Sequence, residues 1–96
     1  MEFYLALMFT FSDIGPRALY YGYDGPLGML ACSGSRQEFE KDRAETEGMA
    51  GAIFHGKDPR LTAAVCASGR HPPISEEQRT ANEAADRVTK DFFKKR

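Results

Sequence analysis

Apolar residues alternate with other residues along the first eleven positions of the chain. This period of two over residues 3–11 predicts a β-strand. The intervening positions are themselves half apolar, which favours a central strand with both faces at least partly covered. A turn at residues 13–16 and an aromatic run over residues 18–23 predict a second strand. The alternating apolar positions are Phe3, Leu5, Leu7, Phe9 and Phe11.

A short apolar run at residues 28–32 follows the turn residues Asp24, Gly25 and Pro26. Bounded by a turn on one side and by small polar residues on the other, it predicts a third short strand. Short turns between consecutive strands favour antiparallel neighbours. We therefore expect a three-stranded antiparallel β-meander over about 2–33.

The pattern then changes to that of a helix. Ser35 and Glu38 have the spacing of a capping box, in which each side chain satisfies a backbone N–H at the start of a helix. They predict a helix over about 36–54. Its apolar stripe is thin, and Gly48 and Gly51 each weaken it by about 1 kcal/mol relative to alanine.

Two further helices are expected. An aspartate followed by a proline at residues 58–59 is typical of a helix start and predicts a helix over about 59–68. Ser75 and Gln78 form a second capping box, and apolar residues at helical spacing follow them. These features predict a last helix over about 75–93.

The expected architecture is α+β: a three-stranded antiparallel meander followed by two or three helices packed on the sheet. At 96 residues the chain has the size of a single small domain, residues 1–96. The order of three strands and a helix over residues 3–54, with a glycine turn and a capped helix, is similar to antitoxins of the HicB type. An antitoxin-like or regulatory homodimer is therefore one hypothesis for the function.

The charge balance excludes some classes of function. Thirteen basic and fourteen acidic residues give a net charge of −1, whereas proteins that bind nucleic acid show a basic excess or stripe. We expect no direct sequence-specific binding to nucleic acid. The apolar run at residues 3–11 is too short to cross a membrane, and acidic Glu2 before it has the wrong sign for a signal peptide. A cytoplasmic location and no membrane association are expected.

The two cysteines are the residues best suited to covalent chemistry. In a cytoplasmic protein both are expected to stay reduced. Cys32 precedes the predicted helix start, with Arg36 in the first turn, and both features lower the pKa of a thiol. A thiol-dependent enzyme that uses Cys32 with Arg36 is thus an alternative hypothesis. Cys66, near the end of a predicted helix, is expected to be inert.

Neither a metal site nor a cofactor is expected. Together with His55 and His71, the cysteines supply suitable metal-ligating atoms, but their spacings contain none of the short ligand pairs of structural zinc sites. No serine, histidine and acidic residues are arranged as in a nucleophilic triad. The chain therefore has no catalytic constellation beyond the Cys32 hypothesis, and we do not expect an enzyme.

Aromatic and acidic residues are the candidates for partner contact. Tyr20 and Tyr21 are adjacent on a predicted strand, so their side chains must point to opposite faces. Exposed tyrosines often anchor protein interfaces, although packing on the sheet with the hydroxyl at its rim explains them equally well. Acidic residues on the first helix could steer a basic partner, or simply be solvated. The candidate partner-binding residues are Tyr20, Tyr21, Tyr23, Glu40, Glu47 and Phe93.

The favoured hypothesis is a non-enzymatic protein-binding module. It would be a small inhibitor or adaptor, of the sort that phages and mobile elements encode against host defences, and would act by occluding a surface of another protein. The partner is either a different protein or a second copy of the chain.

Overall fold

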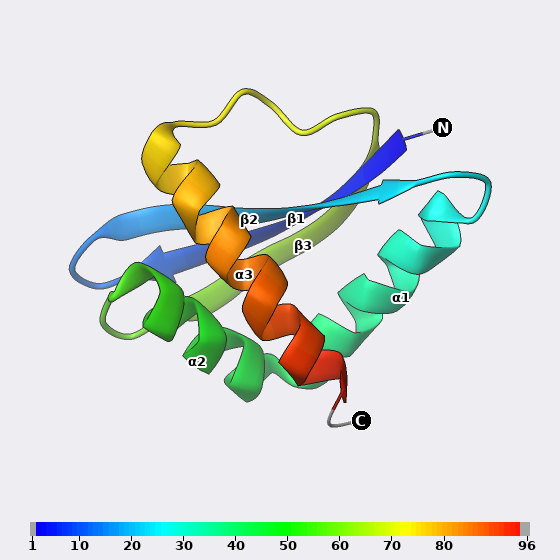
Figure 1. The fold of residues 1–96 in the computed structure, drawn as a ribbon. Helices are drawn as coiled ribbons and strands as arrows, with labels where there is room; N and C mark the ends of the chain where they lie inside the picture. The colour runs from blue at the N-terminus through cyan, green and yellow to red at the C-terminus, as the bar shows by residue number, and fades with distance from the viewer. Residues whose placement is uncertain (1, 95–96) are drawn as a thin grey trace.

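Within residues 2–94, the part of the chain that it describes, the computed structural model contains three antiparallel strands and three helices (Figure 1). Side chains are described as far as Thr89. The α+β class, with helices packed on a three-stranded antiparallel sheet, is confirmed. The elements are β1 (Glu2–Phe11), β2 (Gly15–Asp24), α1 (Gly28–Lys41), α2 (Arg43–Phe54), β3 (Arg60–Ser68) and α3 (Glu76–Lys94).

The first strand is central, as its two-sided apolar pattern predicted. The sheet order is β2-β1-β3, and β1 pairs antiparallel with both neighbours. Leu5 lies opposite Tyr21 on one side and opposite Cys66 on the other. A β-bulge interrupts the pairing with β3 between Met8 and Phe9. The predicted strands over 3–11 and 18–23 correspond to β1 and β2.

The prediction of a third strand in the meander is wrong. Residues 28–33 begin α1 instead, so the chain has only two consecutive strands before its first helix. A short apolar run fits a buried strand and one turn of a buried helix equally well. The helix therefore starts well before the predicted capping box, and Ser35 lies in its interior. The order of elements on which the similarity to HicB-type antitoxins rested is absent.

The predicted helix over 59–68 is also wrong, because these residues form β3. Asp58 has a left-handed backbone, with φ of 53°, and does not cap a helix. Its carboxylate instead accepts a hydrogen bond from the Ser12 hydroxyl at 2.8 Å. Thr62 and Val65 are β-branched and favour an extended chain. Pairing with β1 thus outweighs the helical spacing of the apolar residues.

The predicted helix over 36–54 is interrupted at Asp42, which separates α1 from α2. Thr46 holds this junction together. Its buried hydroxyl lies 2.9 Å from the carbonyl oxygens of both Phe39 and Asp42. The predicted helix over 75–93 corresponds closely to α3. Ser75 caps its start, because the Ser75 hydroxyl accepts a hydrogen bond from the N–H of Gln78 at 3.1 Å.

All the helices bury residues against one face of the sheet. Leu5, Leu7 and Phe9 of β1 point into this layer and are fully buried. Phe39 of α1 stacks on Tyr21 of β2, with ring centroids 5.4 Å apart. From the end of β3 the chain arches back to the start of α3 through residues 69–75, drawn in yellow in Figure 1.

The outer edge of β2 is covered by side chains of α3. The amide of Gln78 donates to the carbonyl oxygen of Ala18, and the N–H of Tyr20 donates to the Asn82 side chain at 3.1 Å. Edge strands have backbone groups that demand partners. Here a helix supplies them without a further strand.

A disulfide between Cys32 and Cys66 joins α1 to β3. The expectation of two reduced cysteines is therefore wrong for this structure. The residues are 34 positions apart in the sequence, so the bond closes a long loop that spans all of α2. Cross-linking such a loop restricts the unfolded chain and stabilises the folded one.

We expect reduction of this disulfide to lower the free energy of unfolding by about 3–4 kcal/mol, because the closed loop is long. Urea denaturation with and without a reductant measures the difference. The double variant Cys32→Ala/Cys66→Ala is the control and should be insensitive to the reductant. Mass spectrometry that finds two free thiols in the untreated protein would contradict the bond itself.

Replacing Asn82 with alanine is expected to destabilise the protein by about 1 kcal/mol, because the partly buried N–H of Tyr20 loses its acceptor. Glu83→Ala, at the exposed neighbouring position of α3, is the matched control and should have a much smaller effect. Equal stability of the two variants in urea denaturation would show that Asn82 does not cover the β2 edge.

Candidate interaction surface

The edge formed by β3 differs from that of β2, because only its beginning is covered. The N–H of Leu61 donates to the Glu47 carboxylate at 2.7 Å, and the guanidinium of Arg43 donates to the Leu61 carbonyl oxygen at 3.0 Å. Both partners belong to α2. Glu47 thus supports the fold at this point.

The remainder of β3, residues 63–68, forms the β3 edge. The N–H of Gly69 donates to the carbonyl oxygen of Glu2, which fixes the alternation of hydrogen bonds between β3 and β1. By this alternation, Ala64 and Cys66 direct their N–H and C=O groups away from β1. In the described part of the chain, no other strand pairs with this edge.

The sheet face opposite the helices, here called the uncovered face, carries mostly apolar side chains. Met8 and Val65 are 37% and 51% exposed there, and the neighbouring alanines are small, so the face is shallow. Tyr4 and Tyr20 lie at one end, with ring centroids 6.1 Å apart. The residues of the uncovered face are Tyr4, Ala6, Met8, Tyr20, Ala63, Val65 and Ala67.

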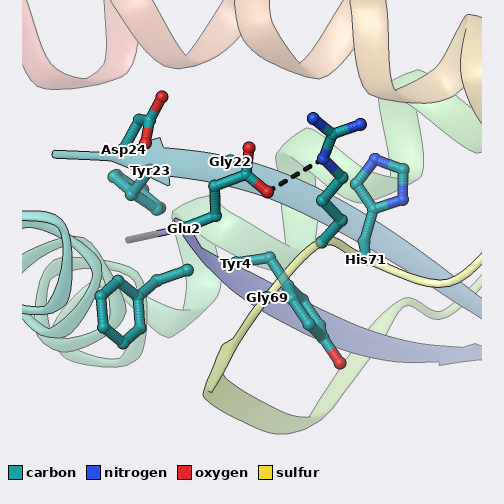
Figure 2. Close-up of a pocket in the computed structure, with 9 residues that line it drawn as sticks. Glu2, Tyr4, Gly22, Tyr23, Asp24, Gly69 and His71 are labelled. Carbon is teal, nitrogen blue, oxygen red and sulfur yellow. Dashed lines mark hydrogen bonds and ion pairs between the residues drawn. The ribbon is translucent and has the colours of Figure 1, made fainter.

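A hollow of about 440 Å³ lies at the same end, where β1 begins and β2 and β3 finish (Figure 2). The Tyr4 ring forms part of its wall. Arg70 and His71 reach it from the segment after β3, and the His71 ring stacks on Tyr20 at 5.4 Å. The hollow is therefore continuous with the uncovered face through Tyr4 and Tyr20.

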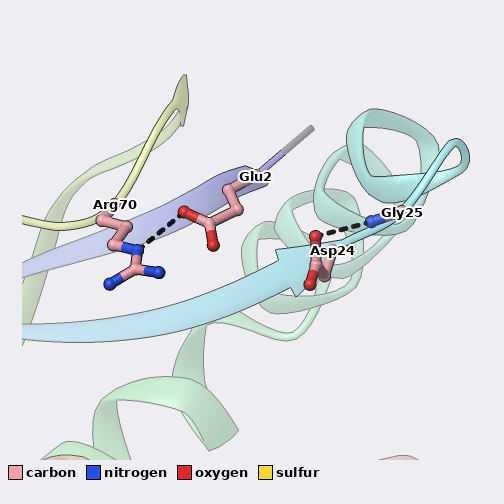
Figure 3. Close-up of polar contacts among 4 residues, drawn as sticks. All are labelled: Glu2, Asp24, Gly25 and Arg70. Carbon is pink, nitrogen blue, oxygen red and sulfur yellow. Dashed lines mark hydrogen bonds and ion pairs between the residues drawn. The ribbon is translucent and has the colours of Figure 1, made fainter.

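The charged groups of this hollow are already paired with one another. Nε of Arg70 donates to the Glu2 carboxylate at 2.9 Å (Figure 3). This hydrogen bond, with the nearby charge of Asp24, raises the pKa of Arg70 above its ordinary value. Asp24 itself accepts the backbone N–H of Gly25 at 2.9 Å (Figure 3). The pair fastens the segment after β3 to the start of β1.

The predicted tyrosine anchors lie in three different settings. Tyr21 is only 6% exposed, and its hydroxyl hydrogen-bonds that of Thr89 at 3.0 Å. Burial raises the pKa of Tyr21 above its ordinary value, and a smaller effect of the same kind raises the pKa of half-buried Tyr23. Tyr20 alone of the three belongs to the uncovered face. Tyr21 is thus a core residue, in agreement with the packing alternative.

The two acidic candidates, Glu40 and Glu47, also lie in different settings. Glu47 accepts the N–H of Leu61, whereas exposed Glu40 lies 3.6 Å from Arg36, one turn before it on α1. Glu40 also lines a hollow with the first residues of β3. Phe93 lies in α3, but its side chain is outside the described residues.

Cys32 has no free thiol in this structure, because its sulfur is bonded to Cys66 and it is fully buried. Arg36 pairs with Glu40. The prediction of a reactive thiol at Cys32, activated by Arg36, is therefore wrong for this structure. The expected helix start beside Cys32 is absent too, since α1 begins at Gly28.

Sequence reasoning missed the β3 edge and the uncovered face. The signal lies in β-branched Thr62 and Val65, which favour a strand, whereas the spacing of the apolar residues in the same segment favours a helix. Among the described residues, no group of three or more histidine, cysteine or acidic side chains is placed to hold a metal ion. The described helices also include none with the length and apolar character to span a membrane.

Comparison with known proteins gives no relative. No protein-family model matches the chain, and neither a curated protein nor a solved structure resembles it significantly.

Proposed function

We propose that the chain is a non-enzymatic protein-binding module that acts by occluding a surface of a partner protein. The observation that carries this proposal is the uncovered face. A layer of apolar side chains lies there on the outside of a sheet whose other face is packed by helices. A small inhibitor or adaptor, of the type that phages and mobile elements use against host defences, fits this arrangement.

The composition of the uncovered face supports the proposal. Exposed apolar patches with a polar border are typical of sites where proteins interact. Met8 and Val65 supply apolar area, and Tyr20 supplies an aromatic ring with a polar hydroxyl at the border. The alanines between them leave a shallow surface that a broad, flat partner can approach.

The charged groups beside this face would orient the partner. Glu2 and Arg70 form an ion pair at one end, with Arg70 largely exposed. Exposed Glu40 lies on the helix layer next to β3. Charges at the border of an interface mainly set the rate and the specificity of association.

The cytoplasmic location remains a prediction, and the Cys32–Cys66 disulfide counts against it. Disulfides persist in oxidising compartments and are rare in the cytosol, where thiols are kept reduced. We propose that the chain binds its partner in a compartment where this disulfide is stable.

The substitution Met8→Lys tests the proposal. It places a charge in the centre of the uncovered face and should abolish capture of a specific partner protein from a cell lysate, because a buried unpaired charge is costly. Val88→Lys is the matched control: Val88 is an apolar residue of α3, 42% exposed against 37% for Met8. It should leave capture unchanged.

Circular dichroism and thermal unfolding must show that both variants are folded. A partner that is retained equally by Met8→Lys and by the wild type would exclude the uncovered face as the binding surface. Loss of the partner in Val88→Lys alone would place the surface on the helix layer instead.

A further inference from the structure

We infer that the β3 edge pairs with the β3 edge of a second copy of this chain, so that two sheets join into one of six antiparallel strands. The inference goes beyond the proposed function, because it concerns an edge of the sheet and needs no other protein. Its basis is that the backbone groups of the β2 edge are hydrogen-bonded by helix side chains, whereas those of the β3 edge are not.

The fold covers its backbone groups at one edge and leaves them uncovered at the other. Gln78 and Asn82 satisfy the outer groups of β2, and Arg43 and Glu47 do the same for Leu61 at the start of β3. Residues 63–68 have no such cover in the described part of the chain. Edge strands of monomers usually carry charges or prolines that oppose pairing, and this segment has neither.

The sequence of the β3 edge is self-complementary. Ala64 and Cys66 direct their backbone groups outward, so an antiparallel pair centred on Val65 joins Ala64 of each copy to Cys66 of the other. Val65 then meets Val65 of the second copy, and Ala63 meets Ala67. Each of these cross-strand pairs is apolar and small, which allows close contact.

The net charge of the chain does not oppose this arrangement. A net charge of −1 gives two copies little mutual repulsion. At the ends of the paired strands, Arg60 of one copy comes near Arg70 of the other. Arg70 is already paired with the Glu2 carboxylate, which provides a counter-charge there.

The expected contact is a strip along the edge strand with a helix layer beside it. A contact along residues 63–68 alone is a strip roughly 20 Å long. However, α1 is tied to β3 by the disulfide and adds a second layer beside it.

The first turn of α1 also carries exposed apolar residues. Met29 and Leu30, in the first turn of the helix, are 47% and 70% exposed. Antiparallel pairing of the β3 edges would bring the two α1 helices to neighbouring positions on the same side of the joined sheet. Burial of apolar area there adds to the hydrogen bonds between the strands.

Sedimentation equilibrium of the purified protein tests the inference. The wild type should behave as a dimer, with twice the mass of the 10.7 kDa chain. Val65→Lys should weaken dimerisation at least tenfold, because the two-fold axis places the new charges directly opposite each other. Met8→Lys, on the same face but on the central strand, should leave the dimer intact.

Mixing provides a test of the register. Val65→Lys and Val65→Glu should each be monomers alone and should form a heterodimer when combined. A wild type that stays at 10.7 kDa throughout the micromolar range would overturn the inference. Loss of the dimer in Met8→Lys would also overturn it, because the copies would then meet through the uncovered face. Partner capture is measured separately, so failure of the proposed function leaves this result unaffected.

Discussion

The backbone groups at the two edges of the sheet impose the constraint on which the rest of the structure depends. A three-stranded sheet has one strand with two neighbours and two strands with a row of N–H and C=O groups that need partners. β1 takes the central position because both of its faces carry apolar residues. The helix α3 supplies amide side chains to β2, and α2 supplies Arg43 and Glu47 to the first part of β3. What remains is the β3 edge, next to an apolar face that no described helix covers.

The disulfide acts on the same side of the molecule. Cys66 lies on β3 and Cys32 on α1, so the bond fixes the edge strand to the helix layer. An edge strand held by one neighbouring strand is easily lost from a sheet, and a cross-link to a helix opposes that loss. The disulfide thereby removes the thiol chemistry that Cys32 alone suggested, while it stabilises the strand on which the inferred dimer depends.

Much of the fold could be predicted from local sequence. The alternation at residues 3–11 gave β1, and the capping box of Ser75 and Gln78 gave the start of α3. Two elements are predicted as the wrong type, a strand at 28–32 and a helix at 59–68, because short apolar runs do not distinguish a helix from a strand. Residues 28–32 continue into a long helix, and residues 60–68 pair with a strand fifty or more positions earlier. A pairing between residues so far apart cannot be predicted from a local pattern. The interaction surface could not be predicted either, because the β3 edge and three of the seven residues of the uncovered face depend on where β3 lies.

Amide hydrogen exchange of Ala64 and Cys66, measured as a function of protein concentration, tests the central claim most directly. Both amides point away from β1 and have no partner within the described chain, whereas the amide of Tyr20 donates to Asn82. The account predicts that Tyr20 is protected at every concentration, and that Ala64 and Cys66 exchange fast in dilute solution and become protected as the concentration rises. Protection of Ala64 and Cys66 that is independent of concentration, or its absence even in a sample that sediments as a dimer, would contradict it.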